Sequence, residues 1–530
     1  MTGGDLLIEC LLQQGVTDVF GMPGLQIDHI YGSLIRRQDR IRHVLYRNEQ
    51  SGALMAEGYA RASGRPGVCL TVPGPGATNA ATAVAEASSA STPLLLITGG
   101  SKREFQDKHP TRLFHGLDHD RFFASVTKWH GIVLSAADIP QFVEQAFEHL
   151  LSGRPGPVHL EFPPDVLEET VEAVPCAEVK RVPQPTDTSD LEALTAELSK
   201  ARAPIIIAGM GVVFSHGAEA LRRLSETWQA PVTTSLLARG AVSEEHPLSL
   251  GCMRGAKAGE LIEAADCVLA VGCRFTQLDS RTWTLGLPQP LFCLATDEHD
   301  VPPEYPVAAA IHGEISTLLE SLTDDLQSHG NPPRDDWLER VEIARNDHWS
   351  QKTYPLISAL REVVPKDAII GADVHTNAYR MQAFLPVFSS RSYLYSAVYV
   401  GLGYGLPAAI GAKVHFPEKC VLAVCGDGGF GMTGTEIGTV AQEGMDLKII
   451  VINDGGFTSI RPGQERITGG QTLGADLKNP DYMKLAEAYE IQGLSVSTAD
   501  RLQDTLEEAM NQTGPVLVEL ENSSGWATSS

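Results

Sequence analysis

The chain has 530 residues and a formal net charge of −25 at pH 7, with 43% hydrophobic and 20% charged residues. This length exceeds what one hydrophobic core usually supports, and it predicts three domains of roughly 150–200 residues each. The composition is that of a globular protein, and the excess of negative charge argues against nucleic acid or an anionic membrane as a partner.

The cysteines and the N-terminus indicate a reducing compartment. The nine cysteines form no CxxC pair, and Cys69, Cys267 and Cys425 fall inside apolar runs, as small core residues do. The N-terminus lacks the basic start of a secretory signal, and no apolar run is long enough to span a membrane. We therefore expect a cytoplasmic protein with no disulfide framework and no membrane partner.

The first third of the chain alternates strand and helix patterns. Helical patterns cover residues 5–14 and 51–63, and short apolar strand patterns lie between helix-length segments. Strands that alternate with helices predict a parallel, doubly wound sheet in a first domain of residues 1–170. The expected strands are residues 16–20, 44–46, 67–72, 94–98 and 158–161.

The rest of the chain divides at two polar, proline-containing segments, residues 168–189 and 329–336, which read as linkers. Between them we expect a central domain, residues 190–328, with strands at 205–211, 266–275 and 291–297. A third domain, residues 345–525, repeats the rhythm of the first. Its expected strands are 368–372, 392–395, 421–425, 447–453 and 516–521, with helices at 407–414 and 481–489. The predicted fold class is α/β, with three doubly wound parallel-sheet domains.

Two strand patterns of the third domain end in glycine and acid. One ends at Gly426-Asp427-Gly428-Gly429, the other at Asn453-Asp454-Gly455-Gly456, and a helix-length segment, residues 434–443, separates them. Their tips should meet at the carboxyl edge of a parallel sheet, where such sheets bind ligands. Asp427, Asp454 and the backbone carbonyl of Gly456 suit a hard divalent cation, while Gly426, Gly428 and Gly429 would let a phosphate approach the backbone and the following helix N-terminus. Alone, the first segment would be a simple strand-to-helix turn.

Taken together, the two tips resemble the motif of thiamine diphosphate enzymes, with Asp454 in place of a second asparagine. Other segments occur in the order typical of the family, so the resemblance covers nearly the whole chain. The chain resembles the thiamine diphosphate-dependent 2-oxo acid decarboxylase and carboligase superfamily, and most of all the catalytic subunits of acetolactate synthase (acetohydroxyacid synthase). These segments are residues 15–24, 47–53, 58–64, 74–79, 153–158 and 403–411.

The resemblance implies how the chain is organised and what it binds. The three domains would be a pyrimidine-binding, a central and a diphosphate-binding domain. The cofactors would be thiamine diphosphate and Mg²⁺, and the substrate a small 2-oxo acid or aldehyde. The family also implies a homodimer or homotetramer with active sites between subunits.

The resemblance also assigns residues. Glu49, which alone would be read as a solvated surface carboxylate, would hydrogen-bond a ring nitrogen of the cofactor's aminopyrimidine. Leu402 would be the apolar wedge beneath the cofactor, and His375 and Thr376 would contact the diphosphate with Asn453 nearby. His115 matches a histidine of pyruvate-type decarboxylases and is a candidate acid, base or substrate-orienting group, although a lone histidine is usually structural.

Some segments depart from acetolactate synthase. Gly463 stands where those enzymes carry a tryptophan that shapes the acceptor pocket. Leu25, which lies beside Gln26 near the reacting carbon, stands where some decarboxylases of the family carry Asp or Ser, so one candidate acid is absent here. A decarboxylase or carboligase with a different pocket therefore fits better than a strict acetolactate synthase. The segment Gly209-Met210-Gly211 leaves FAD open, so a flavin-linked oxidase of the pyruvate oxidase type is one alternative. The other is a non-catalytic cofactor-binding homologue.

Overall fold

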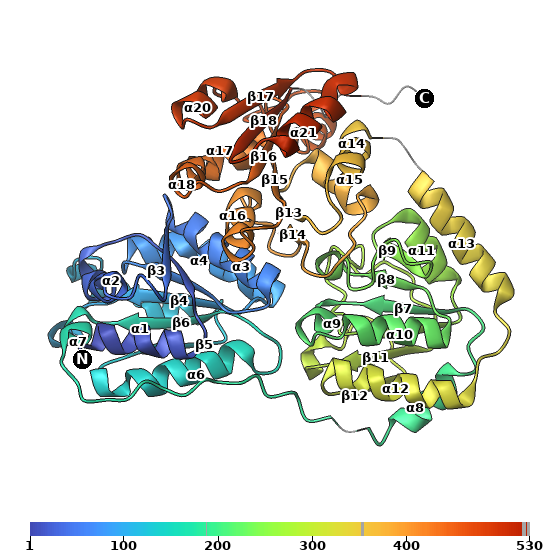
Figure 1. Cartoon of the computed structure of the whole chain (residues 1–530). Coiled ribbons are helices and arrows are strands. Elements are labelled where there is room, and N and C mark those ends of the chain that lie inside the picture. Colours follow the sequence, from blue (N-terminus) through green and yellow to red (C-terminus); the bar gives the residue numbers. More distant parts are fainter. Residues whose placement is uncertain (187, 351–353, 522–525, 527–530) are drawn as a thin grey trace.

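The computed structural model describes residues 1–186, 188–350, 354–521 and 526. Three six-stranded sheets, in which every strand pair is parallel, lie in three bodies that surround a common junction (Figure 1). The expected fold class, α/β with three doubly wound parallel sheets, is thereby confirmed. The exact domain limits stay a prediction, and the expected end at residue 525 lies outside the described residues.

The first sheet has the strand order β2-β1-β3-β4-β6-β5. Strands β3 and β4 are buried at every position, which explains their continuous apolar sequence. The strands are β1 Asp18–Gly21, β2 Arg42–Leu45, β3 Gly67–Thr71, β4 Leu94–Gly99, β5 Trp129–Ile132 and β6 Val158–Phe162. The helices are α1 Gly3–Gln13, α2 Asp28–Ile35, α3 Glu49–Ser63, α4 Pro75–Ala90, α5 His119–Phe123, α6 Ile139–Leu151 and α7 Pro164–Glu168.

The third sheet has the order β14-β13-β15-β16-β18-β17, which is the same topology as the first. In both sheets the second strand lies on one side of the first strand and the third strand on the other, and such a switch point opens a crevice at the carboxyl ends. The strands are β13 Ile369–Ala372, β14 Tyr393–Tyr395, β15 Val421–Gly426, β16 Lys448–Asn453, β17 Gln492–Val496 and β18 Val516–Glu521. The helices are α14 Pro355–Val363, α15 Thr376–Phe384, α16 Gly405–His415, α17 Asp427–Thr433, α18 Ile437–Gln442, α19 Arg461–Thr468, α20 Tyr482–Ala488 and α21 Leu502–Asn511.

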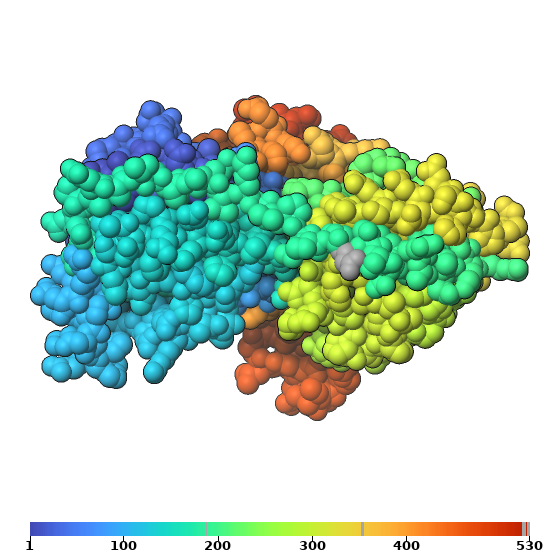
Figure 2. Space-filling model, turned by 90° about the horizontal axis from the view of Figure 1, so that it is seen from below, coloured from blue at the N-terminus to red at the C-terminus, as the bar shows by residue number. Residues whose placement is uncertain are grey.

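The central sheet has the order β12-β11-β10-β7-β8-β9, with its switch point between β7 and β10. The segment before it crosses from the first domain to the central one along the underside of the molecule (Figure 2). The strands are β7 Pro204–Ala208, β8 Val232–Thr234, β9 Ser249–Cys252, β10 Cys267–Val271, β11 Leu291–Ala295 and β12 Ala309–His312. The helices are α8 Leu191–Leu198, α9 Met210–Phe214, α10 Ala218–Trp228, α11 Ala256–Ala264, α12 Ile315–His329 and α13 Asp335–Ser350.

The first and third domains dock through α3 and α16 (Figure 1). These helices share one apolar core with residues from both sheets, including Phe20, Leu96 and Val451. The docking brings the start of α3, where Glu49 lies, toward the third domain.

The structure adds elements that the sequence patterns did not predict. Strands β5, β8, β9, β12 and β17 are new, as are several helices whose ranges were not predicted, among them α13. The expected helix over residues 434–443 is a 3-10 turn, Gly434–Glu436, followed by the short α18. The second linker is shorter than expected, because α12 ends at His329 and α13 begins at Asp335. No helix among the described residues is long and apolar enough to cross a membrane.

Candidate active site

The two acidic tips of the third sheet lie together as predicted. Asp427 follows β15 directly and is 4% exposed, and Asp454 follows β16. Burial raises the pKa of Asp427, and the charge of Asp454 adds to this effect, while hydrogen bonds from Asn479, Gly456 and Gly428 oppose it. Because burial disfavours the ionised form of this carboxyl group, a nearby cation would stabilise that form strongly.

The hydrogen bonds of Asp427 fix its orientation. Its Oδ1 accepts from the Gly428 amide at 2.9 Å, and its Oδ2 accepts from the Gly456 amide at 2.9 Å and from Asn479 Nδ2 at 2.7 Å. The carbonyl of Gly456 accepts from the Thr458 amide at 2.9 Å and retains a second lone pair. Two carboxylates and one carbonyl can therefore contribute oxygen ligands to a cation.

His375 and Thr376 lie beside these tips, after β13. His375 caps α15 by accepting the Ala378 amide on Nδ1 at 3.2 Å, and burial lowers its pKa to about 3. The imidazole is therefore neutral with its proton on Nε2. The Val424 backbone acts against the lowering of the pKa, but the buried N–H makes no well-formed hydrogen bond among the described residues. Thr376 Oγ1 hydrogen-bonds Thr458 Oγ1 at 2.9 Å. A phosphate oxygen would satisfy the orphaned N–H.

The glycines of the first tip are required by close approaches inside the domain. A Cβ atom on Gly429 would lie 2.1 Å from Asp373 Oδ2, and one on Gly428 would lie 2.5 Å from the Phe457 ring. A Cβ on Gly426 would lie 2.8 Å from Cβ of His375. A side chain on Gly426 would push His375 away, one on Gly429 would push Asp373, and one on Gly428 would push Phe457.

Asn453 has its side-chain amide committed within the third domain. Its Nδ2 donates to Glu519 Oε1 at 2.7 Å, and its Oδ1 accepts from Asn479 at 2.8 Å. These contacts fix the end of β16 and therefore the direction of the backbone at Asp454, the next residue.

Leu402 lies between the third domain and the start of α3. Its carbonyl accepts a long hydrogen bond, 3.5 Å, from Gln50, and the next residue, Gly403, donates its amide to Asp373 Oδ1 at 3.2 Å. Its side chain is half-buried, so the expected wedge lies next to the helix that carries Glu49.

Glu49 begins α3 and is 8% exposed. Its Oε2 accepts from Asn79 Nδ2 at 3.0 Å, and its Oε1 lies 3.4 Å from the place where a Cβ on Gly76 would stand. Glu49 thus belongs to a cluster of the first domain, whereas the partners of Asp427 belong to the third.

His115 and Gln26 form a second cluster in the first domain. His115 Nδ1 lies 3.2 Å from Gln26 Nε2, and the ring stacks on Phe114 at a centroid distance of 4.0 Å. His115 adopts a positive φ of 54°, and its carbonyl oxygen lies 2.7 Å from the point where a Cβ on Gly74 would stand, so glycine is needed there. Gly74 starts the turn into α4 that also carries Asn79.

A cavity of about 740 Å³ opens beside this cluster. Leu25 and Phe114, which line it, are 76% and 72% exposed. Charged groups of both signs share the lining, among them Asp28, Lys102 and Arg112. The cavity can hold a molecule much larger than a two- or three-carbon acid.

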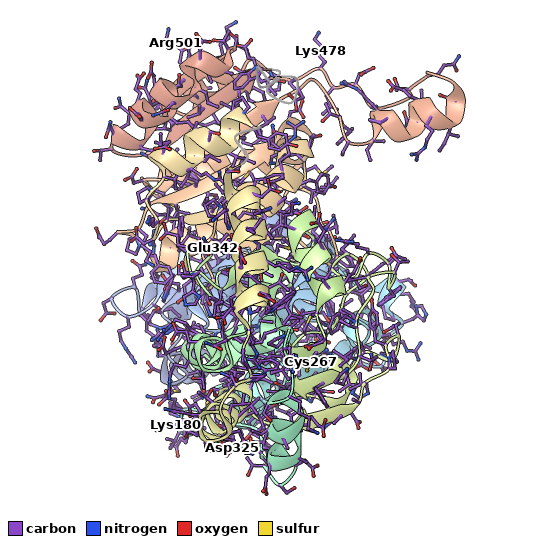
Figure 3. All side chains as sticks on the ribbon, turned by 90° about the vertical axis from the view of Figure 1, so that its right-hand side faces the viewer. Lys180, Cys267, Asp325, Glu342, Lys478 and Arg501 are labelled. Atoms are coloured by element: carbon purple, nitrogen blue, oxygen red, sulfur yellow. The ribbon has the colours of Figure 1, made fainter. Side chains whose placement is uncertain are left out.

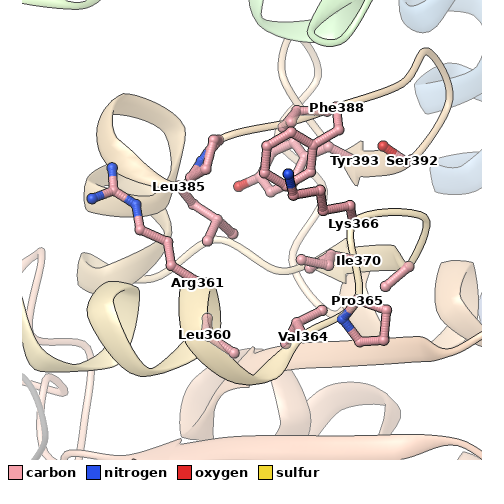
Figure 4. A pocket seen from close by; sticks show the side chains of 13 residues that line it. Leu360, Arg361, Val364, Pro365, Lys366, Ile370, Leu385, Phe388, Ser392 and Tyr393 are labelled. Atoms are coloured by element: carbon pink, nitrogen blue, oxygen red, sulfur yellow. The ribbon is translucent and has the colours of Figure 1, made fainter. Parts of the chain in front are cut away.

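A second pocket lies at the opposite end of the third sheet (Figure 4). It is lined by Leu360, Ile370 and Tyr393 and has a volume of about 30 Å³. Such a volume holds a water molecule rather than a substrate, so the candidate site stays at the carboxyl ends.

The central domain uses its Gly-Met-Gly segment for packing. A Cβ on Gly209 would lie 2.2 Å from the Gly272 carbonyl, and one on Gly211 would lie 2.5 Å from the Gly272 Cα. The close approach of two backbones is therefore sufficient to explain both glycines without a nucleotide.

The residues fit a cation and a diphosphate. Within the described ranges no group of three or more His, Cys, Asp or Glu side chains could hold a metal ion. A cation here would accordingly depend on Asp427, Asp454, the Gly456 carbonyl and oxygens of the phosphate itself. The unpaired His375 Nε2–H and the buried, unpaired Oδ2 of Asp373 mark the same crevice as a place for a polar ligand.

Sequence reasoning missed three contributors. Asn79, the partner of Glu49, stands in a segment that the resemblance already contained, so a signal existed. His119 Nδ1 hydrogen-bonds Glu161 at 2.8 Å while its Nε2 accepts the Gly74 amide at 3.3 Å, and no local pattern predicts this pair. Asn479 lies 52 residues after Asp427 and likewise carries no local signal.

Comparison with known families gives three matches along the chain. The family model described as "Thiamine pyrophosphate enzyme, N-terminal TPP binding domain" matches residues 1–120. The central domain of the same family matches residues 191–322, and its C-terminal TPP binding domain matches residues 374–520. Each match falls in a different one of the three domains.

Curated relatives are similar over almost the full length. A probable 2-ketoarginine decarboxylase of Pseudomonas aeruginosa is 33% identical, with 98% of this chain and 94% of the relative covered. A probable acetolactate synthase large subunit of Methanocaldococcus jannaschii is 31% identical, with 98% and 92% covered. The acetolactate synthase isozyme 2 large subunit of Escherichia coli is 30% identical, with 98% and 96% covered.

Proposed function

The chain belongs to the thiamine pyrophosphate enzyme family, and from that premise we propose that it decarboxylates a 2-oxo acid. Transfer of the resulting fragment to a second carbonyl compound, a carboligation, is part of the proposal. The observation that carries it is the crevice at the carboxyl ends of β13, β15 and β16. Oxygens for a cation lie there beside an unpaired imidazole N–H for a phosphate.

In this proposal the third domain holds the charged end of thiamine diphosphate. Asp427, Asp454 and the Gly456 carbonyl bind Mg²⁺, and His375 Nε2–H donates to a phosphate oxygen. Thr376 and the amide of Gly429 complete the phosphate contacts, and Gly428, whose amide donates to Asp427 Oδ1, lets the phosphate approach the backbone. Gly426 and Asn453 act behind them, because they fix His375 and the end of β16.

The first domain supplies the side chains that take part in proton transfer. Thiamine diphosphate, when bound, supplies the electron sink that a 2-oxo acid needs in order to lose carbon dioxide. Glu49 holds the pyrimidine ring through a hydrogen bond, and Asn79 keeps one carboxylate oxygen in place. Gln26 engages Nδ1 of His115 and so leaves Nε2 for a proton transfer to or from the substrate.

We further propose that each active site is completed by a second copy of the chain. Glu49 and Asp427 belong to separate clusters, and each of the two domains exposes large apolar side chains. Leu25 and Phe114 stand out from the first domain, while Ile467 and Leu473 of the third are 82% and 88% exposed. Apolar surface of this kind marks an interaction site.

The substrate class follows from the cavity beside His115. Its volume of about 740 Å³ favours a 2-oxo acid with a side chain larger than a methyl group. The name of the Pseudomonas relative, a 2-ketoarginine decarboxylase, supports a long side chain, and the acetolactate synthase names support carboligation. Decarboxylation of a bulky 2-oxo acid is therefore our first candidate.

The test uses purified protein with thiamine diphosphate and Mg²⁺. Pyruvate and branched, aromatic and basic 2-oxo acids are compared for carbon dioxide release, and for carboligation with an added aldehyde. We expect turnover on at least one bulky 2-oxo acid. No release from any acid, in protein that binds the cofactor, would contradict the proposal, and a flavin absorbance band would favour the oxidase alternative.

The variant Glu49→Gln tests the role of Glu49 in turnover. Glutamine keeps the size but cannot exchange a proton, so we expect turnover to fall by about 100-fold or more while cofactor affinity changes less. Glu339→Gln, at an exposed position of α13, is the control and should leave turnover unchanged. Unchanged turnover in Glu49→Gln would remove Glu49 from the mechanism.

A further inference from the structure

Asn479 joins the two acidic tips of the third sheet. It lies between the exposed Lys478 and α20, at the base of an arm, residues 457–477, that projects from the body of the molecule near Lys478 (Figure 3). Its Nδ2 donates one hydrogen bond to Asp427 Oδ2 at 2.7 Å and one to Asn453 Oδ1 at 2.8 Å. Both amide hydrogens are therefore used.

Lone pairs decide which oxygen of Asp427 is open to a cation. A carboxylate accepts about two hydrogen bonds or metal bonds on each oxygen. Oδ2 already accepts two, from Gly456 and Asn479, whereas Oδ1 accepts one, from Gly428. A cation can approach Oδ1 without breaking a hydrogen bond, but it can reach Oδ2 only if a donor leaves.

We propose that Asn479 is a positioning residue that makes Asp427 bind the cation through one oxygen and thereby favours Mg²⁺ over Ca²⁺. The inference rests on the proposed cation site. Mg²⁺ requires a compact octahedron of single oxygen ligands at about 2.0–2.1 Å, whereas Ca²⁺ accepts six to eight ligands at about 2.3–2.6 Å and often takes both oxygens of a carboxylate. Blocking Oδ2 removes the two-oxygen mode.

The surroundings hold the Asn479 amide in this orientation. Glu519 accepts Nδ2 of Asn453 at 2.7 Å, so Asn453 turns its Oδ1 toward Asn479. A flipped Asn479 amide would set its oxygen against the oxygens of Asn453 and Asp427, which is repulsive. The orientation is therefore fixed by the network.

The backbone at the base of the arm keeps Asn479 within reach. The amide of Phe457 donates to the Ala475 carbonyl at 2.8 Å, and the amide of Leu477 donates to the Gly455 carbonyl at 3.0 Å. These bonds close the arm immediately before Asn479. A donor mounted on a closed base is preorganised and needs no rearrangement when the cation arrives.

The experiment titrates Mg²⁺ and Ca²⁺ separately into metal-free protein in the presence of excess thiamine diphosphate, with binding followed by calorimetry. In Asn479→Ala we expect Mg²⁺ affinity to fall by about 10–100-fold, as for other residues that orient a metal ligand, and Ca²⁺ affinity to fall much less. Glu519→Leu should shift the preference in the same direction, because it removes the acceptor of Asn453 Nδ2 and so loosens Asn453. The exposed Asn511→Ala is the control and should keep the wild-type preference.

The thermal unfolding of the metal-free proteins separates positioning from a structural role. We expect Asn479→Ala and the wild type to unfold at similar temperatures in the presence of a chelator. An unchanged ratio of the two affinities would overturn the inference, whether both cations bind as in the wild type or both bind equally more weakly. Failure of the wild type itself to bind thiamine diphosphate with either cation would overturn the proposed function instead.

Discussion

Glu86 is a buried carboxyl group at the contact between the first and third domains. It lies on α4 and is 1% exposed. Its Oε2 accepts from Ser396 Oγ at 2.5 Å, and its Oε1 has no partner among the described residues. Burial, together with the nearby Glu57 carboxylate, raises the pKa of Glu86 to about 7, although Ser396, Arg61 and Gly401 act in the opposite direction.

This raised pKa predicts a stability that falls as pH rises. The unfolded chain loses the proton near the ordinary pKa of 4.5, whereas the folded chain keeps it to about pH 7. Between these values the folded state binds more protons, so the free energy of unfolding decreases with increasing pH. Glu86→Gln removes the ionisation and should stabilise the protein by about 1–3 kcal/mol at pH 8 but hardly at pH 4.5.

Thermal unfolding of the wild type and Glu86→Gln, measured from pH 4.5 to 8.5, checks the prediction. Glu192→Gln, at an exposed position of α8, serves as the control and should follow the wild type at every pH. Parallel curves for Glu86→Gln and the wild type would mean that Glu86 does not titrate in this range.

Sequence could predict the residues that end a strand. Asp427 and Asp454 follow apolar runs, and the parallel order of β15 and β16 brings them together as expected. Glu86 and Asn479 could not be predicted in this way, because their partners come from distant segments. Ser396 lies 310 residues after Glu86, and only the docking of the two domains makes them neighbours.

At the scale of elements, the packing of α3 on α16 depends on two glycines. A Cβ on Gly411 would lie 1.9 Å from the Met55 carbonyl oxygen, and one on Gly58 would lie 2.4 Å from the Ala408 Cα. Both obstacles are backbone atoms, which cannot rotate away. The two helices are thus held closer than any side chain at these positions would allow.

Gly411→Ala should therefore destabilise the protein, although alanine is the better helix former. The gain in helix propensity is about 1 kcal/mol, and the overpacking costs about 1–3 kcal/mol, with a backbone obstacle at the upper end. We expect a lower temperature of the first thermal transition. Gly463→Ala in α19, where a Cβ would meet nothing within 4 Å, is the matched control and should be neutral or stabilising. A Gly411→Ala protein as stable as the wild type would show that the helices can separate without cost.

Elements differ in how well their sequences predicted them. Interior strands such as β4 and β15 are buried throughout and read as continuous apolar runs. Four of the strands that the patterns missed, β5, β9, β12 and β17, lie at sheet edges. An edge strand has fewer buried positions, as in β17, where one of five residues is buried, so its apolar signal is weak.

At the scale of the whole molecule, the first and third domains repeat one topology and place one cluster each at a switch point. The repeated rhythm was visible in the sequence, but the strand order was not, because period and propensity carry no information on which strands are neighbours. Glu49 with Asn79 and Asp427 with Asn479 are the two clusters. Their separation raises the question of which chain unites them.

A mixture of two inactive variants answers that question. If each site takes Glu49 from one subunit and Asp427 from another, a hybrid of Glu49→Gln and Asp427→Asn chains contains one doubly altered site and one intact site. Hybrids purified through two different tags after co-expression should then regain about a quarter to a half of wild-type turnover, depending on how pairs assemble in a dimer or tetramer. Each variant alone should remain inactive.

The control is the same co-expression with Glu49→Gln on both tagged chains, which creates no intact site in any arrangement. Turnover of the mixed hybrid no higher than that of this control would assign Glu49 and Asp427 of one site to the same chain. In that case the exposed Leu25, Phe114, Ile467 and Leu473 would need another explanation. Recovery in the mixed hybrid alone follows only from sites shared between subunits, because neither parent chain carries both intact residues.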